Sequence, residues 1–247
     1  MGRQKSQQTS RKPAGFAHRQ RRAGTLFIIG TPIGSPDDLT FRARTVLGRV
    51  SIIAAETPLV TRALLEHHGI AATITGYQAD EEKIAVLLDR LNRGDDIALV
   101  SDSGMPVIYD PGQLLIAAAH AAGHLVTVVP GPSAVTAAAA LSGFPADRLL
   151  FVGKLPRSPR HLDRLFTALT HDVATVVMFA PSSALPSILE RIARILPNRL
   201  ATLAVNMTKS GEEVHQGKPR RLLERARSLP KDSEVTLVLS RARNRRT

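Results

Sequence analysis

The sequence predicts an α/β protein of two domains. From Thr25 onward, short apolar and β-branched runs alternate with longer stretches of helical periodicity, a pattern typical of βαβ units around a buried, mostly parallel sheet. In the second half these runs follow one another both with and without helices between them, which favours a mixed sheet there. A length of 247 residues is sufficient for two modest domains with buried cores.

The first domain is expected over residues 25–145, with each strand followed by a helix. Its strands are expected at residues 26–30, 51–55, 73–77, 97–101 and 126–129. Its helices are expected at residues 39–47, 59–68, 80–91, 112–122 and 132–141.

A turn-forming stretch, Gly-Phe-Pro-Ala-Asp at residues 143–147, breaks this alternation and places the domain boundary after residue 145. The second domain is expected over residues 146–240. Its strands are expected at residues 149–155, 173–179, 200–206, 213–216 and 234–240. Its helices are expected at residues 159–169, 184–196 and 220–228.

The formal net charge of +12 is concentrated at the two ends of the chain. Residues 1–22 contain seven Lys/Arg and residues 241–247 contain four, with no Asp or Glu in either segment, so the remainder is close to neutral. We therefore expect a disordered basic tail at residues 1–24 and a second basic tail at residues 241–247. Such tails are either simply solvated or attracted to polyanions such as nucleic acid.

Several classes of protein are excluded by what the sequence lacks. There is no cysteine, so disulfides, thiolate zinc sites and a cysteine nucleophile are excluded, which fits the cytoplasm. No apolar run approaches the twenty residues that span a bilayer, and no membrane association is expected. Histidines and carboxylates do not occur at metal-ligand spacing, so no metal is expected.

Three loops of similar composition follow expected strands of the first domain. Each replaces an apolar strand abruptly with glycine, proline and small polar residues: Gly-Thr-Pro-Ile-Gly at 30–34, Ser-Asp-Ser-Gly-Met-Pro at 101–106 and Pro-Gly-Pro-Ser-Ala at 130–134. The carboxyl ends of parallel strands are where open α/β sheets bind ligands. Neither a Gly-rich dinucleotide fingerprint nor a phosphate-binding loop is present, which favours a ligand with an adenosyl group and no phosphate.

Five motifs, in this order and spacing, resemble the ribosomal RNA small-subunit methyltransferase I family, a branch of the tetrapyrrole methylases, over about residues 25–240. They are TPIG at 31–34, AAETPLVTRALL at 54–65, ALVSDSGMPVIYDPG at 98–112, VPGPSA at 129–134 and GKLPR at 153–157. The resemblance implies two α/β domains of tetrapyrrole-methylase type with S-adenosylmethionine between them, and a homodimer. It also implies methylation of a cytidine 2′-hydroxyl in small-subunit (16S) ribosomal RNA, so that ribosomal RNA or the small ribosomal subunit is the expected partner.

The same resemblance implies which residues bind the cofactor. They are Pro32, Asp102, Gly104, Met105, Ser133, Ala134, Ala180 and Met207. Asp102 is expected to be the polar anchor and Met105 a backbone contact.

Methylation of a ribose hydroxyl needs a base, or a cation that stabilises the developing alkoxide. Glu56, Lys209 and Glu212 are the catalytic candidates, since each lies at or just beyond an expected strand end. Candidates for binding the substrate are Arg62, Arg157 and Arg160.

The chain departs from the family pattern at residues 57–59, 178–183 and 205–211. Thr57-Pro58-Leu59, for example, stands where the family usually has Asp-Thr-Arg. These changes remove charged positions from the expected cleft and leave the substrate open. Two alternatives are a methyltransferase acting on a corrin-type tetrapyrrole, and an RNA-associated protein that binds the cofactor without catalysis.

Overall fold

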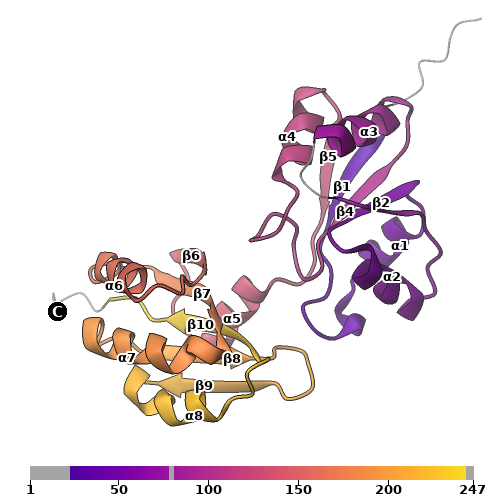
Figure 1. Ribbon diagram of the computed structural model, residues 1–247. Helices are drawn as coiled ribbons and strands as arrows, with labels where there is room; N and C mark the ends of the chain where they lie inside the picture. Colours follow the sequence, from indigo (N-terminus) through magenta and orange to yellow (C-terminus); the bar gives the residue numbers. More distant parts are fainter. Residues whose placement is uncertain (1–22, 78–80, 243–247) are drawn as a thin grey trace, which may run out of the picture.

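The computed structural model describes residues 23–77 and 81–242 as two lobes joined near the middle of the chain (Figure 1). The basic tails expected at both ends lie almost entirely outside these residues. Within the described ranges, no helix has both the length and the apolar character needed to span a bilayer.

The first lobe contains a five-stranded sheet in the order β3-β2-β4-β1-β5. All of its neighbouring strands pair in parallel, as the sequence predicts. The strands are β1 (Thr25–Ile29), β2 (Ile52–Ala55), β3 (Ile74–Gly76), β4 (Ile97–Val100) and β5 (Leu125–Val129). Parallel pairing places all five carboxyl ends at one edge of the sheet, where the three loops emerge.

Helices cover both faces of this sheet and produce two cores. Side chains of α1 (Phe41–Leu47) and α2 (Pro58–His67) pack in one core, and those of α3 (Glu81–Asn92) and α4 (Gln113–Ala121) pack in the other. The helix expected from residue 39 begins two residues later, because Thr40 is the N-cap and its hydroxyl accepts a hydrogen bond from the amide of Ala43. A short 3₁₀ helix, η1 (Pro36–Asp38), precedes it.

The second lobe contains a mixed sheet in the order β6-β7-β10-β8-β9. The β6–β7 pair is parallel and the other three pairs are antiparallel, which confirms the mixed sheet predicted from the sequence. The strands are β6 (Leu149–Lys154), β7 (Thr175–Pro181), β8 (Ala201–Val205), β9 (Glu213–Gly217) and β10 (Glu234–Leu239). The helices that follow them are α6 (Pro159–Ala168), η2 (Ser182–Ala184), α7 (Leu185–Ile195), η3 (Pro219–Leu222) and α8 (Leu223–Ser228).

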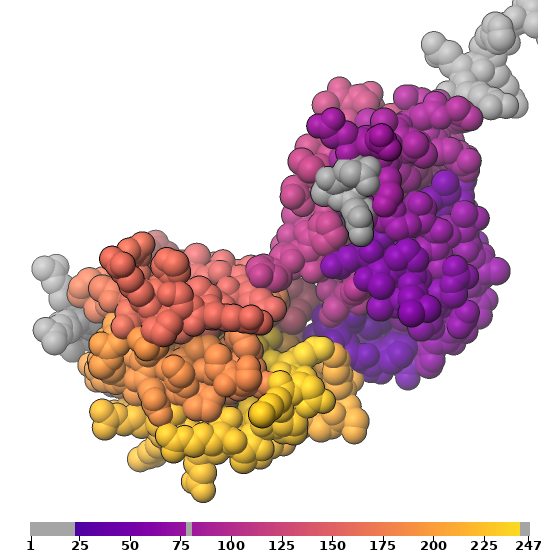
Figure 2. Space-filling view, viewed as in Figure 1, coloured from indigo at the N-terminus to yellow at the C-terminus, as the bar shows by residue number. Residues whose placement is uncertain are grey.

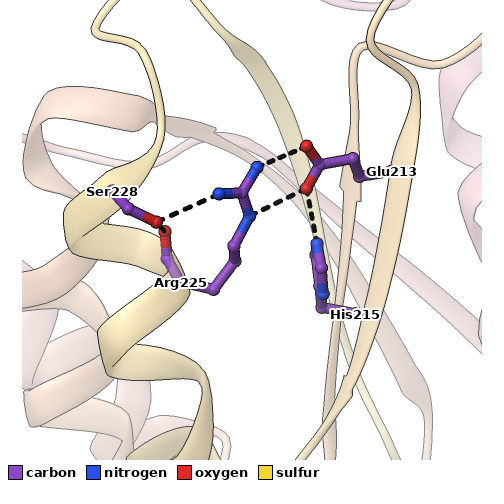
Figure 3. Close-up of polar contacts among 4 residues, drawn as sticks. All are labelled: Glu213, His215, Arg225 and Ser228. Carbon is purple, nitrogen blue, oxygen red and sulfur yellow. Dashed lines mark hydrogen bonds and ion pairs between the residues drawn. The ribbon is translucent and has the colours of Figure 1, made fainter.

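The helix expected at residues 220–228 is divided into η3 and α8, and a polar cluster fixes α8 to β9 (Figure 3). Arg225 donates two hydrogen bonds to the carboxylate of Glu213, and His215 lies 2.6 Å from the same carboxylate. The hydrogen bond from Arg225, followed by that from His215, lowers the pKa of Glu213 below its ordinary value. The guanidinium also donates to the hydroxyl of Ser228 at 3.0 Å.

Helix α5 (Ala134–Ser142) follows the last strand of the first sheet but packs against the second sheet. Val135, Ala138 and Ala139 are buried in one cluster with side chains of β7, β8 and β10. The alanines allow the helix to approach the sheet closely. The packing of α5 therefore crosses the boundary that the sequence places after residue 145.

Ala138→Leu tests the packing of α5. Ala138 is 0% exposed, so a larger side chain must displace the sheet residues, and we expect the free energy of unfolding to fall by about 1–3 kcal/mol. Urea denaturation followed by circular dichroism measures the change. The matched control is Ala140→Leu, the same substitution at an exposed position of the same helix. Equal stability of the two variants would contradict the packing described.

Candidate active site

The three loops meet at the carboxyl edge of the first sheet, as the sequence predicts. The loops after β1 and β5 touch through backbone, since a Cβ at Gly30 would lie 2.7 Å from the Cα of Gly131. The β1 and β4 loops are joined by a hydrogen bond of 2.9 Å from the amide of Thr31 to the carbonyl of Gly104. Only glycine permits the close approach of Gly30 to Gly131. These backbone contacts hold the three loops that form the rim of the site in fixed relative positions.

Thr31 fixes the relative position of the β1 and β4 loops. Its buried hydroxyl lies 3.1 Å from the carbonyl oxygen of Ser101 and 3.2 Å from that of Gly104. Gly104 has a φ of +82°, a conformation that other residues rarely adopt. The carbonyl of Gly104 accepts from both the amide and the hydroxyl of Thr31, so it faces the β1 loop.

Asp102 is held at the start of α2. Its Oδ1 accepts from the amide of Thr57 at 3.0 Å, and its Oδ2 accepts from the hydroxyl of the same residue at 2.7 Å. In return, the amide of Asp102 donates to Oε2 of Glu56 at 3.1 Å. Thr57, which departs from the family pattern, thus orients the expected cofactor anchor.

Asp110 is a titratable group of this edge that the sequence reading did not single out. The pKa of its carboxyl is raised from 3.8 to about 6, first by burial and then by the charge of Glu56; a hydrogen bond with Ser101 opposes the rise, and the charge of Asp102 adds a smaller contribution to it. A carboxylate with a pKa near 6 is suited to accept a proton close to neutral pH. The sequence does give a reason to consider Asp110, because it lies in the motif at residues 98–112, one of the five that resemble those of the family.

A pocket of about 360 Å³ lies between the two lobes. The first lobe contributes Ile33, Ser103 and Ala134. From the second lobe, the lining comes from three strand ends and the residue that closes β6: Lys154, Phe179, Ala180, Pro181, Ser182, Ser183, Met207, Lys231, Ser233, Glu234, Val235 and Thr236. The hollow between the lobes is visible in Figure 2.

The loop after β8 carries the second lobe onto the first. Asn206 and Thr208 have positive φ values of 49° and 59°, and the carboxylate of Glu212 accepts from the amide of Thr208 at 2.9 Å. The hydroxyl of Thr208 accepts from the amide of Ser35 at 3.0 Å, which joins the lobes. A Cβ at Gly34 would lie 2.4 Å from that hydroxyl, so this contact also requires glycine.

A second contact between the lobes involves aromatic rings. Tyr109 lies edge-on to Phe179, with ring centroids 6.4 Å apart, and Phe179 contacts Phe151 in turn. Tyr109 has a φ of 70° and Val107 one of 76°. These residues hold a strained backbone, which indicates that the surrounding contacts determine the loop's shape.

The residues expected to bind the cofactor fall into three groups. Ala134, Ala180 and Met207 line the pocket between the lobes. Pro32 and Asp102 instead line a neighbouring pocket of about 310 Å³ beside α2. The remaining expected residues, Gly104, Met105 and Ser133, belong to the loops that form the rim and line neither of these two pockets.

The catalytic candidates are divided between the lobes. Glu56 accepts from Asp102 in the first lobe, whereas Glu212 and Lys209 lie in the second. The ammonium of Lys209 is 2.5 Å from a carboxylate oxygen of Glu234, which lines the pocket between the lobes. Glu56 and Glu212 thus bind backbone amides, while Lys209 is paired at the edge of this pocket.

The three expected substrate residues are exposed. Arg62 lies on α2, Arg157 precedes α6 and Arg160 lies in its first turn. Among the residues described, no cluster of three His, Cys, Asp or Glu could hold a metal ion.

Lys231 and residues 233–236 line the pocket and were not identified from the sequence. This segment enters β10, which lies in the middle of the second sheet. No motif distinguishes Ser233 or Thr236 from ordinary residues of a turn and a strand. The position of Ser233 and Thr236 in the pocket follows only from the strand order, which brings the start of β10 between the ends of β7 and β8.

Comparison with known proteins identifies the family. Residues 25–222 match the family model described as tetrapyrrole (corrin/porphyrin) methylases. A ribosomal RNA small subunit methyltransferase I from Thermotoga maritima is 37% identical over 219 residues, which cover 88% of this chain and 98% of the relative. The protein of the same name from Xylella fastidiosa is 42% identical over 197 residues, covering 78% of this chain and 72% of the relative. The chain belongs to the ribosomal RNA small subunit methyltransferase I family.

Membership of the ribosomal RNA small subunit methyltransferase I family confirms the resemblance found in the motifs and makes this chain a methyltransferase. Its fold is shared with a solved uroporphyrin-III C-methyltransferase from Thermus thermophilus in complex with S-adenosylhomocysteine. That structure has a TM-score of 0.57 and 17% sequence identity, covering 88% of this chain and 97% of the other.

Asp110→Asn tests whether the pKa of the Asp110 carboxyl is raised in the folded protein. The folded-state pKa of about 6 exceeds the ordinary value of 3.8, so between these pH values the folded protein binds more protons than the unfolded chain. Stability is then lost as the pH rises through 6. We expect the variant to unfold at a higher temperature than the wild type at about pH 7.5, and the difference to vanish near about pH 4.

Thermal unfolding at the two pH values measures this difference. The matched control is Asp147→Asn at an exposed position. A difference between Asp110→Asn and wild type that does not change with pH would contradict the assignment.

Proposed function

We propose that this protein transfers a methyl group from S-adenosylmethionine to the 2′-hydroxyl of a cytidine in small-subunit (16S) ribosomal RNA. The pocket between the lobes carries the proposal, since loops with the family's motifs form its rim. Support for the RNA substrate comes from the relatives, which are named as ribosomal RNA methyltransferases.

The pocket suits S-adenosylmethionine in size and character. Its volume of about 360 Å³ is within the range of small-molecule sites. Ile33, Ala134 and Met207 offer apolar contacts, and the hydroxyl groups of Ser103 and Ser233 offer hydrogen bonds. Asp102 lines the neighbouring pocket beside α2, where Thr57 fixes its carboxylate, and it directly precedes Ser103 of this pocket. It is the proposed polar anchor.

S-adenosylmethionine, when bound, supplies a methyl group on a sulfonium. The protein's own contribution is then chiefly positioning, because in-line attack depends on the alignment of the reacting atoms. The glycine contacts at Gly30 and Gly34 hold the loops and lobes in fixed relation. Such rigidity is what an orienting site requires.

Proton transfer from the ribose hydroxyl is the remaining chemical task. Lys209 is the proposed cation for the developing alkoxide, and its stem passes close to Gly34 at the junction of the lobes. Asp110, with its raised pKa, joins Glu56 as a proposed proton acceptor. Glu212 is proposed to act by holding the loop at Thr208.

The homodimer and the cytoplasmic location also stay predictions. Edge strand β5 supports the dimer, because Leu125 and Val128 on it are 56% and 46% exposed. Apolar side chains on an unpaired sheet edge favour association. Analytical ultracentrifugation would determine the oligomeric state.

S-adenosylhomocysteine should raise the unfolding temperature of the wild type. A ligand present at 100 times its Kd stabilises the folded state by about 2.7 kcal/mol. Ala134→Leu fills part of the pocket, and we expect its affinity for the ligand to fall at least about tenfold, as overpacking costs about 1–3 kcal/mol. Thermal unfolding measures the stabilisation and isothermal titration calorimetry measures the affinity, with Ala140→Leu as the matched control. Absence of binding to the wild type would refute the proposed cofactor.

Ribosomal RNA from cells with and without the gene should differ by one ribose methyl group on a cytidine of the small-subunit RNA. A 2′-O-methyl group protects the adjacent phosphodiester from alkaline cleavage, since the attacking hydroxyl is blocked. Mass spectrometry of nuclease fragments measures the difference. Identical ribose methylation in the two RNAs would reject the RNA substrate, and a methylated tetrapyrrole product would favour the alternative.

A further inference from the structure

The end of β6 and the first turns of α6 form a strongly basic segment. Residues 154–164 contain four Lys/Arg and one acid, although the chain between its two tails is close to neutral. The four cations, here called the basic face, are Lys154, Arg157, Arg160 and Arg164. Such a local excess of charge is a candidate electrostatic footprint.

The basic face is exposed and its charges are not neutralised locally. All four side chains are on the surface, and none makes an ion pair with another residue of the described part of the chain. The one nearby acid, Asp163, accepts instead from Arg191 at 2.6 Å and Arg194 at 2.9 Å on α7. These two guanidinium groups more than offset its charge.

Helix α6 presents two of these charges, Arg160 and Arg164, on a rigid support. Leu162 and Phe166 bury its opposite face in the core of the second lobe. Arg160 and Arg164 are four residues apart, so they lie one above the other on the same face of the helix. Neither side chain has to be ordered by a moving loop before it meets a partner.

The basic face continues into the pocket between the lobes. Lys154, its first member, lines that pocket. Figure 2 shows the segment around residues 150–165 forming the surface of the second lobe beside the hollow. A polymer lying along this surface therefore has one end of its path at the site of chemistry.

We propose that the basic face binds phosphates of the RNA strand flanking the target nucleotide. This inference rests on the proposed function, and it assigns the surface that holds the RNA. The occupant follows from charge complementarity: several exposed guanidinium groups without local acids suit a chain of phosphates, which arginine binds bidentately. An acidic ribosomal protein is the competing partner.

Salt dependence distinguishes this surface from an ordinary solvated helix face. Each phosphate contact on a single strand contributes about 0.7 to the slope of log affinity against log salt. Loss of three contacts should therefore reduce the slope by about 2. Removal of three charges that touch no RNA should change it little.

The test compares two triple variants of the full chain. The first is Arg157→Gln, Arg160→Gln and Arg164→Gln; the control is Lys218→Gln, Arg220→Gln and Arg221→Gln, which removes the same charge from exposed cations at η3. Both keep the basic tails. Binding to unmodified, protein-free small-subunit RNA is measured by fluorescence anisotropy across a salt series, beside methyl transfer and S-adenosylhomocysteine affinity.

We expect the first variant to lose at least about tenfold in RNA affinity at low salt and to show the smaller slope. Its kcat at saturating RNA and its S-adenosylhomocysteine affinity should match the control. Equal affinity and slope in the two variants would overturn the basic face. So would a loss seen with intact subunits and not with protein-free RNA, since the partner would then be a ribosomal protein.

The proposed methyl transfer to RNA and the proposed role of the basic face can be refuted independently. A wild type that binds RNA through the basic face but transfers no methyl group to it would refute the proposed function alone. Methyl transfer that is insensitive to the first triple variant, in both KM and salt response, would refute the basic face alone.

Discussion

The backbone contact between Gly30 and Gly131 is the constraint on which the site depends. Because β1 and β5 are parallel neighbours, their loops leave the sheet together, and only the absence of side chains lets them touch. Thr31 then ties the β4 loop to this pair. The rim is consequently determined by the sheet and not by a ligand, which is the preorganisation expected of a positioning enzyme.

The second lobe completes the site from a different direction. Helix α5 leaves the rim directly and packs on the second sheet, so the position of that sheet is tied to the end of β5. The contacts of Thr208 with Ser35 and of Tyr109 with Phe179 reinforce this connection at two other points. Three separate links therefore fix the opening of the pocket.

The sequence predicts the fold well because its strands are short apolar runs ending in glycine and proline, and it predicts the family because motifs occur in order. It could not predict that Thr57 binds both oxygens of Asp102, since residues 57 and 102 meet only through the order of β2 and β4. Nor does it reveal the raised pKa of Asp110, which depends on burial and on Glu56. Ser233 enters the pocket through strand order alone.

The packing of α5 has a consequence for how such a protein can be divided. A fragment ending at residue 145 would carry a helix whose apolar residues, Val135 and Ala138 among them, have lost their cover. The other fragment would expose Val177, Ala204 and Val238 on the bare sheet. The lobes are thus not interchangeable modules: a graft, a split reporter or a gene fusion would have to keep α5 with the second lobe, and cut before residue 134.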